Sequence, residues 1–202
     1  MRAYMTAMLC VWPTKEMKQA ELTSPGERTA SQKAGLASGA LKAAADRACG
    51  DLTEAQINSR RQHMEVAAEA GVPQAALYLV QEGPFGDVTA LDTRPDDPAV
   101  LAWRARMVDL FKLAASKGDV MSMQSLSNMY FDGVGIVDKP DPVLALQYQT
   151  AAQLVYKAQS GRNAIPPFLR KRLTQSLTAE QIAAADAAGG LIAEVALRAN
   201  KP

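Results

Sequence analysis

The chain has 202 residues, enough for one ordinary domain or one short array of repeats. Hydrophobic residues make up 48% and charged residues 21%, a composition typical of a globular protein and not of a disordered one. With 22 basic and 21 acidic residues, the net charge of +1 gives no electrostatic basis for binding nucleic acid or an anionic membrane surface. Alanine alone contributes 37 residues and no clear alternating stretch of strand length is present, so the expected fold class is all-α.

Residues 1–23 are expected to be a disordered or export-signal-like segment. Residues 1–12 are apolar with Arg2 as the only charge, which fits a truncated export signal, but no clean cleavage site follows. No run of about 18 apolar residues exists, so no membrane-spanning helix is predicted. Cys10 and Cys49 can pair only after oxidation, and cleavage of a signal would remove Cys10. Their pairing and the localisation stay open, with the cytoplasm favoured over export.

Capping signals and helical spacing divide residues 24–200 into about seven or eight helices. Ser24, Pro25 and Glu27 mark the first start, and Gly50 suits the residue after that helix. Residues 83–95 and 160–167 are expected to be loops. Two capping boxes start later helices, Thr53 with Gln56 and Thr178 with Gln181. Two further helices start at Asp97-Pro98 and Asp141-Pro142. Short helices are expected at residues 74–81 and 120–131.

One spacing pattern follows both Gly71 and Gly118. From Gly118, a small residue lies at +4, leucine at +8, tyrosine at +12 and glycines at +15 and +17, which are Gly133 and Gly135. From Gly71, the small residue, the leucine and the first glycine recur at the same offsets. Small residues let two helices approach closely, and the glycines permit a turn with positive φ. The pattern predicts a set of buried core residues: Leu79, Trp103, Phe111, Leu126, Tyr130 and Tyr148.

The copy from Ala115 to Ala152 resembles the Sel-one-like repeat family, which is related to the tetratricopeptide repeats. The family pattern has small residues and a leucine on a first helix, a G-x-G turn, and an Asp that begins a second helix. This copy has Ile136 in place of the valine after the turn, and it departs from the pattern by Ser127 at the second small position and by a slightly longer turn before Asp141. The copy from Ala68 to Ala115 is more degenerate. The resemblance covers about residues 60–155 and implies a helical solenoid that acts as an adaptor for other proteins.

The chain shows no recognisable catalytic or zinc constellation. His63 has no visible nucleophile or carboxylate partner, so a surface or satisfied histidine is expected. One histidine and two distant cysteines do not supply the three or four ligands of a zinc site. We therefore expect no metal, no cofactor and no enzymatic activity.

The acidic and basic clusters favour ordinary structural roles. Four aspartates between residues 87 and 97 lack the alternating spacing of a calcium loop, and Asp97 is already explained as a helix cap. The run Arg170-Lys171-Arg172 is expected to be a solvated helix face. Gly133-Val134-Gly135 lacks the third glycine and the preceding strand of a phosphate loop.

The predicted fold is an all-α, short, right-handed α-solenoid of antiparallel helix pairs with N- and C-terminal capping helices. It spans residues 24–200, with the repeat core at about 60–155 and the C-terminal cap at 164–200. One helix pair cannot bury its own apolar face, so the pairs must stack on one another. The expected function is a protein-protein interaction module or adaptor whose partner is another protein and not nucleic acid. Weak self-association is a further option, and the alternative is an enzyme or enzyme inhibitor with a site under the 83–95 loop.

The expected binding surface is the concave side, which the first helix of each pair lines in such solenoids. Positions +4, +8 and +12 point into the stack, whereas +7, +10 and +13 turn away from it. An exposed aromatic side chain among amides is a plausible recognition surface, because aromatics anchor interfaces and amides fix orientation. The partner-binding residues predicted in this way are Tyr78, Gln81, Ser125, Asn128 and Phe131.

Overall fold

The computed structural model describes residues 52–87, 89–162 and 167–199, together with isolated positions before residue 52. The chain divides into two compact units, residues 1–64 and residues 65–202. Every regular element in the described ranges is a helix, which confirms the all-α fold class. The predicted signal-like segment, most of the predicted first helix and Cys10, with its pairing to Cys49, lie outside the described residues, so a domain start at residue 24 stays a prediction.

In the first unit the described helix is the beginning of α4, whose full extent is Glu54–Glu69. The predicted capping box is present at its start. The backbone N–H of Thr53 donates to Gln56 Oε1 over 2.8 Å, and the backbone N–H of Gln56 donates to Thr53 Oγ1 over 3.3 Å. These two bonds satisfy N–H groups that an α-helix leaves unpaired at its start.

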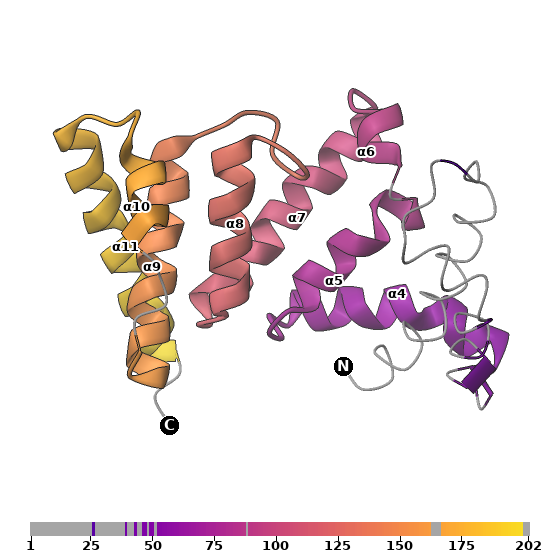
Figure 1. The fold of residues 1–202 in the computed structure, drawn as a ribbon. Coiled ribbons are helices and arrows are strands. Elements are labelled where there is room, and N and C mark those ends of the chain that lie inside the picture. Colours follow the sequence, from indigo (N-terminus) through magenta and orange to yellow (C-terminus); the bar gives the residue numbers. More distant parts are fainter. Residues whose placement is uncertain are drawn as a thin grey trace. The chain divides into compact units, whose positions relative to one another are not determined.

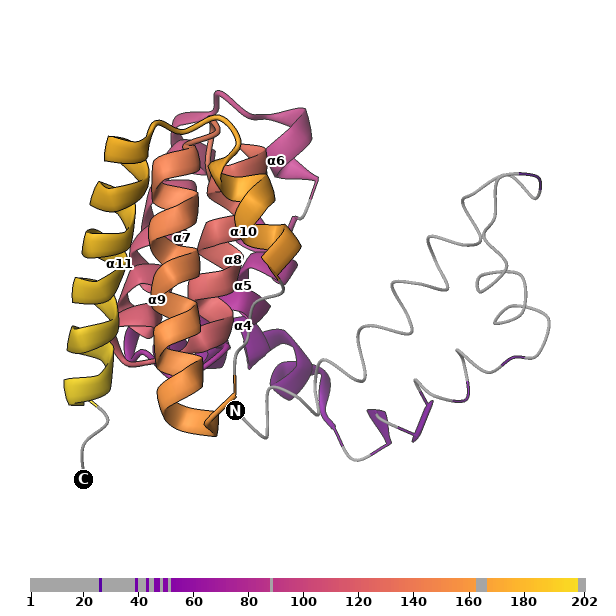
Figure 2. The same ribbon diagram turned by 60° about the vertical axis from the view of Figure 1, so that its left-hand side comes forward.

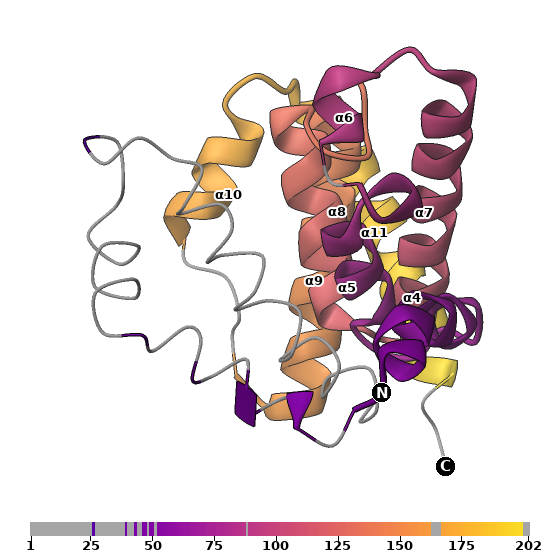
Figure 3. The same cartoon turned by 90° about the vertical axis from the view of Figure 1, so that its right-hand side faces the viewer.

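The second unit alternates short and long helices. It contains α5 (Ala75–Glu82), α7 (Pro98–Ser116), α8 (Val120–Asp132), α9 (Pro142–Ser160), α10 (Pro167–Thr174) and α11 (Ala179–Ala199). The helices α7, α9 and α11 run in one direction and α8 runs in the opposite one (Figure 1). Helix α9 packs against α8 and α11, and Figure 2 shows α11 beside α9 along most of its length. Helix α5 lies against α7 and α8 (Figure 3).

The segment 83–95, predicted as a loop, contains two short helical turns. They are a 3₁₀ turn, η1 (Pro84–Gly86), and one α-helical turn, α6 (Ala90–Thr93). Ala90 is fully buried, and this single apolar anchor attaches the turn to the rest of the unit. One buried residue is too weak a signal for helical periodicity, which needs several turns to be visible.

Both predicted Asp-Pro starts form as expected. Asp97 accepts a hydrogen bond from the backbone N–H of Ala99 over 2.9 Å, and Asp141 accepts one from Leu144, also over 2.9 Å. Proline stands at the first position of α7 and α9, where its missing N–H has no intrahelical partner to lose. The box at Thr178 and Gln181 is also present, with a bond of 2.9 Å from the Thr178 N–H to Gln181 Oε1.

The turn between α8 and α9 uses left-handed glycines, as predicted from their spacing. Gly133 has φ of 66° and Gly135 has φ of 77°. A β-carbon at Gly133 would lie 2.4 Å from Cδ of Pro140, so the turn has no room for a side chain there. The chain can therefore reverse direction within one short segment and start α9 beside α8.

The core contains the side chains that the repeat spacing predicted. Leu79, Leu126 and Phe111 are 1%, 0% and 1% exposed, and Tyr148 and Trp103 are also buried. Tyr130, predicted as core, is only half-buried. Its ring stacks on that of Tyr148, with centroids 5.9 Å apart. Burial raises the pKa of Tyr148 to about 12, so its phenol stays protonated and neutral at physiological pH.

Helices α9 and α11 approach each other closely at a glycine. A β-carbon at Gly189 would lie 2.5 Å from the carbonyl oxygen of Gln147 and 2.8 Å from Cβ of Thr150. On the C-terminal side of this point the interface is built from alanines, with Ala151, Ala152, Ala193 and Ala196 in one buried cluster. Gly190, the next residue, has no atom within 4 Å of the place where a β-carbon would be.

This pair of adjacent glycines gives a matched stability test. We expect Gly189→Ala to lower the free energy of unfolding by about 1–3 kcal/mol, because α11 must move away from α9. Gly190→Ala should raise that free energy by up to about 1 kcal/mol, because alanine favours the helix and meets no neighbour. Urea denaturation of both variants measures the difference. Equal effects would show that α11 does not approach α9 at Gly189.

Candidate functional site

The five predicted partner-binding residues lie on two neighbouring helices. Tyr78 and Gln81 belong to α5, and Ser125, Asn128 and Phe131 belong to α8. Gln81 and Asn128 are exposed, whereas the other three are half-buried. The hydroxyl of Tyr78 donates to Gln74 Oε1 over 3.4 Å. The two amides are therefore the members of the set that are most open to a partner.

The ring of Phe131 is already used inside the protein, which corrects the expectation that it stands exposed. The guanidinium of Arg172 lies 4.3 Å from the centroid of that ring. The ring also packs beside a buried cluster that joins α9, α10 and α11, made of Ala145, Leu146, Leu173 and Ala185. A cation over an aromatic face is attractive, and here it attaches α10 to α8.

The basic run on α10 forms ion pairs, although the sequence suggested only a solvated face. Arg170 donates to both carboxylate oxygens of Asp186 over 3.0 and 2.6 Å. These bonds, together with one from the Thr150 hydroxyl, hold the pKa of Asp186 below its usual range. The stability that this pair contributes is thus present at neutral pH and is lost as the pH falls through the lowered pKa. Arg172 also lies 3.5 Å from Asp132 of α8.

A buried aspartate joins the start of α8 to the turn before α5. Asp119 is 7% exposed, and its Oδ2 accepts bonds from the backbone N–H of Gln74 over 3.0 Å and from the Ser122 hydroxyl over 2.6 Å. Gln74 has φ of 65°, an unusual value for a residue other than glycine. The sequence analysis did not single out Asp119, because its partner is 45 positions away in the chain.

Lys117 makes a second connection at the same place. Its ammonium donates to the carbonyl oxygen of Ala70 over 2.6 Å, and its aliphatic chain lies over Gly71. A β-carbon at Gly71 would lie 2.6 Å from Cδ of this lysine. Glycine is therefore required at position 71 for two reasons. Its φ of 66° is unfavourable for other residues, and a β-carbon there would collide with the side chain of Lys117.

Arg104 lines two adjoining hollows next to the turn between α8 and α9. The hollows have volumes of about 590 and 480 Å³ and share Arg104, Val137 and Asp138. The guanidinium pairs with Asp138 and donates from Nη2 to the carbonyl oxygen of Leu91 over 3.0 Å, while its buried Nε has no hydrogen-bond partner. Arg104 thus ties the turn to the 83–95 segment.

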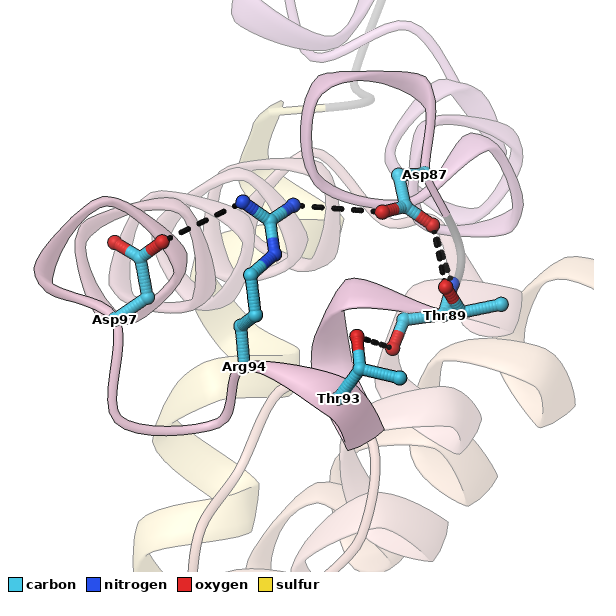
Figure 4. A network of polar contacts seen from close by, with 5 residues as sticks. All are labelled: Asp87, Thr89, Thr93, Arg94 and Asp97. Carbon is cyan, nitrogen blue, oxygen red and sulfur yellow. Dashed lines mark hydrogen bonds and ion pairs between the residues drawn. The ribbon is translucent and has the colours of Figure 1, made fainter.

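Two acidic residues of the 83–97 segment, Asp87 and Asp97, are paired with neighbours in a local network (Figure 4). Asp87 accepts bonds from the Thr89 hydroxyl over 2.7 Å and from Arg94 over 3.4 Å, and Arg94 also lies 3.5 Å from Asp97. The bond from Thr89 holds the pKa of Asp87 below its ordinary value. No group of three or more metal-ligating side chains occurs in the described part of the chain.

His63 is exposed on α4, as expected for a surface histidine. Its Nε2 lies 3.3 Å from the hydroxyl of Ser59, one helical turn earlier. Among the described residues, no helix is long and apolar enough to cross a membrane.

The connection through Asp119 predicts a large effect from one substitution. We expect Asp119→Ala to lower the free energy of unfolding by about 1–3 kcal/mol, because the Gln74 N–H and the Ser122 hydroxyl lose a buried acceptor. Asp92→Ala, the same change at an exposed position, should alter it by less than about 0.5 kcal/mol. Thermal unfolding followed by circular dichroism measures both. A similar effect of the two variants would contradict the connection.

The packing of Phe131 predicts a difference between two phenylalanines. Phe131→Ala should destabilise the protein by about 1–2 kcal/mol, because the ring is half-buried and lies under Arg172. Phe168 of α10 is 72% exposed, so Phe168→Ala should leave the melting temperature nearly unchanged. If Phe131→Ala is also neutral, the ring is free to contact a partner, as the sequence predicted.

Comparison of the chain with models of known protein families, with curated proteins and with solved structures finds no match in any of the three. The resemblance of residues 60–155 to Sel-one-like repeats therefore stays a prediction, and it rests on the sequence pattern of this chain alone.

Proposed function

We propose that the chain is a short array of Sel-one-like helical repeats and that it works as a protein-protein interaction module. The observation that carries the proposal is that equivalent positions in the two copies share backbone conformation and burial. Gly71 and Gly118 have φ of 66° and 83°, and Gly86 and Gly133 have φ of 84° and 66°. Three further equivalent pairs are buried in both copies: Ala75 and Ser122, Leu79 and Leu126, and Phe111 and Tyr148.

The alternation of helix lengths supports a third, closing pair. The short helices α5, α8 and α10 have 8, 13 and 8 residues, and the long helices α7, α9 and α11 have 19, 19 and 21. In this proposal α10 and α11 cap a right-handed solenoid. Terminal pairs in such arrays cover an apolar face that would otherwise be open to water.

The proposed recognition surface consists of the exposed sides of α5 and α8, which we call the α5/α8 face. Gln81 and Asn128 present two exposed amides there, each able to donate and accept hydrogen bonds. The half-buried Tyr78 and Ser125 add polar groups between them. A surface of this kind suits an extended peptide or a loop of another protein, whose backbone groups the amides can pair with.

The 83–95 segment supports a second candidate, an inhibitor that inserts a loop into an enzyme. Phe85 has φ of 57° and is nevertheless 57% exposed. Strained residues with exposed side chains tend to occur at functional sites, and the network around Asp87 and Arg94 holds this segment in one shape. An enzyme active site under the segment has less support, because Asp87, Arg94 and Asp97 already pair with one another.

A capture experiment with the full chain tests the α5/α8 face. The double variant Gln81→Lys with Asn128→Lys places two charges on that face, and Gln175→Lys with Ser176→Lys places the same charges on exposed positions before α11. A partner that binds wild type and the control pair should bind the face variant at least tenfold more weakly, a loss of about 1.4 kcal/mol.

Equal binding of wild type, the face variant and the control variant would show that the interaction does not involve α5 and α8. Loss of binding after Phe85→Ala, with the face variant unaffected, would favour the inserted-loop alternative.

A further inference from the structure

The outer side of α11 is an apolar helix face that no described element of the second unit covers. Leu191 and Val195 are 65% and 56% exposed, among the most exposed large hydrophobic side chains that the structure describes. Ala184 and Ala187 lie on the same side of the helix and are also exposed. Their spacing of three and four residues makes a continuous stripe along the helix, opposite the stripe that packs on α9.

This stripe is complementary to itself when two copies of α11 lie antiparallel. The two large residues stand on the C-terminal side of Gly189 and the two alanines stand on the N-terminal side, at nearly equal distances from it. A two-fold axis near Gly189 therefore places Leu191 against the partner's Ala187 and Val195 against the partner's Ala184. Large side chains then fill the space that small ones leave, as in well-packed helix interfaces.

The charges at the ends of the stripe match the same register. Glu180 and Arg198 are exposed and stand nine residues before and nine residues after Gly189. The same two-fold axis puts Arg198 next to the partner's Glu180 at each end of the contact. Arg198 also pairs with Glu194 one turn earlier, which holds its guanidinium along this side of the helix. A parallel arrangement would instead place like charges and like side chains together.

The surface next to the stripe is apolar as well. A hollow of about 300 Å³ lies beside Leu191 and Val195, and Lys112, Ala115 and Ser116 of α7 form its other wall. Most of its lining side chains are apolar, so the hollow favours an apolar occupant over water.

We propose that the protein forms a homodimer through an antiparallel, two-fold contact between the outer faces of α11. The occupant of the face is a second copy of this chain, because the face is complementary to itself in both shape and charge. One helix against one helix buries an area at the small end of specific interfaces, below about 1,200 Å² in total, so the dimer should be weak, with a dissociation constant in the micromolar range. The dimer does not depend on the proposed α5/α8 function.

Sedimentation equilibrium of the full chain, from about 5 μM to about 500 μM, tests the proposal. Wild type should change from monomer to dimer over this range. Leu191→Asp should weaken the dimer at least tenfold, because it places two charges at the centre of the contact. Phe168→Asp, a matched change at a more exposed hydrophobic residue on α10, should leave the dimer unchanged. Circular dichroism verifies that both variants keep the wild-type helix content.

Charge reversal tests the antiparallel register. Glu180→Arg alone and Arg198→Glu alone should each weaken the dimer about threefold at low salt, and the double variant should recover wild-type affinity, because each reversal creates a like-charge contact that the other removes.

Three outcomes would overturn the proposal. They are a wild type that stays monomeric at the highest concentration, a dimer that tolerates Leu191→Asp, and a double reversal that is as weak as the single ones. If wild type stays monomeric and Leu191→Asp abolishes its binding to a different protein, the face is the binding site of that protein instead.

Discussion

Small side chains on α9 allow two helices to pack against it at once, and the rest of the second unit depends on this. Ala145, Ala151 and Ala152 are fully buried, and Gly189 of α11 lies against the backbone of α9 with no room for a β-carbon. Bulkier residues would push the helix axes apart and open the core around Met123 and Val155. The many alanines thus do more than favour helix formation, because their small side chains also set the distance between the helix axes.

Polar contacts determine how the helices of the second unit are joined at their ends, and apolar packing determines how neighbouring helices approach along their lengths. Asp119 at the start of α8 and Lys117 at the end of α7 both bind the segment before α5, and Arg170 and Arg172 attach α10 to the helices beside it. These groups are directional, so they fix one arrangement of neighbours where alanine surfaces alone would tolerate several. The same division explains why the α5/α8 face can carry exposed amides without cost to the core.

The sequence was sufficient to predict the helix starts at residues 53, 97, 141 and 178, the left-handed glycines and most of the core, because those features depend on residues close together in the chain. Capping boxes, Asp-Pro pairs and the offsets of Leu79 and Leu126 are all local. The short helix α6 was missed because one buried alanine gives no periodicity. The roles of Arg104, Asp119 and Arg172 were missed because their partners are distant in sequence. Phe131 was placed correctly on α8, but its cover comes from a helix whose position no local pattern indicates.

The contact between Asp119 and Gln74 also bears on how the protein folds. The left-handed conformation of Gln74, which begins α5, is supported by a carboxylate at the start of α8. The start of α5 therefore depends on a side chain from a later helix, so α5 should form only once α8 is in place. We expect these two helices to fold in the reverse of their order in the chain, although α5 is synthesised first.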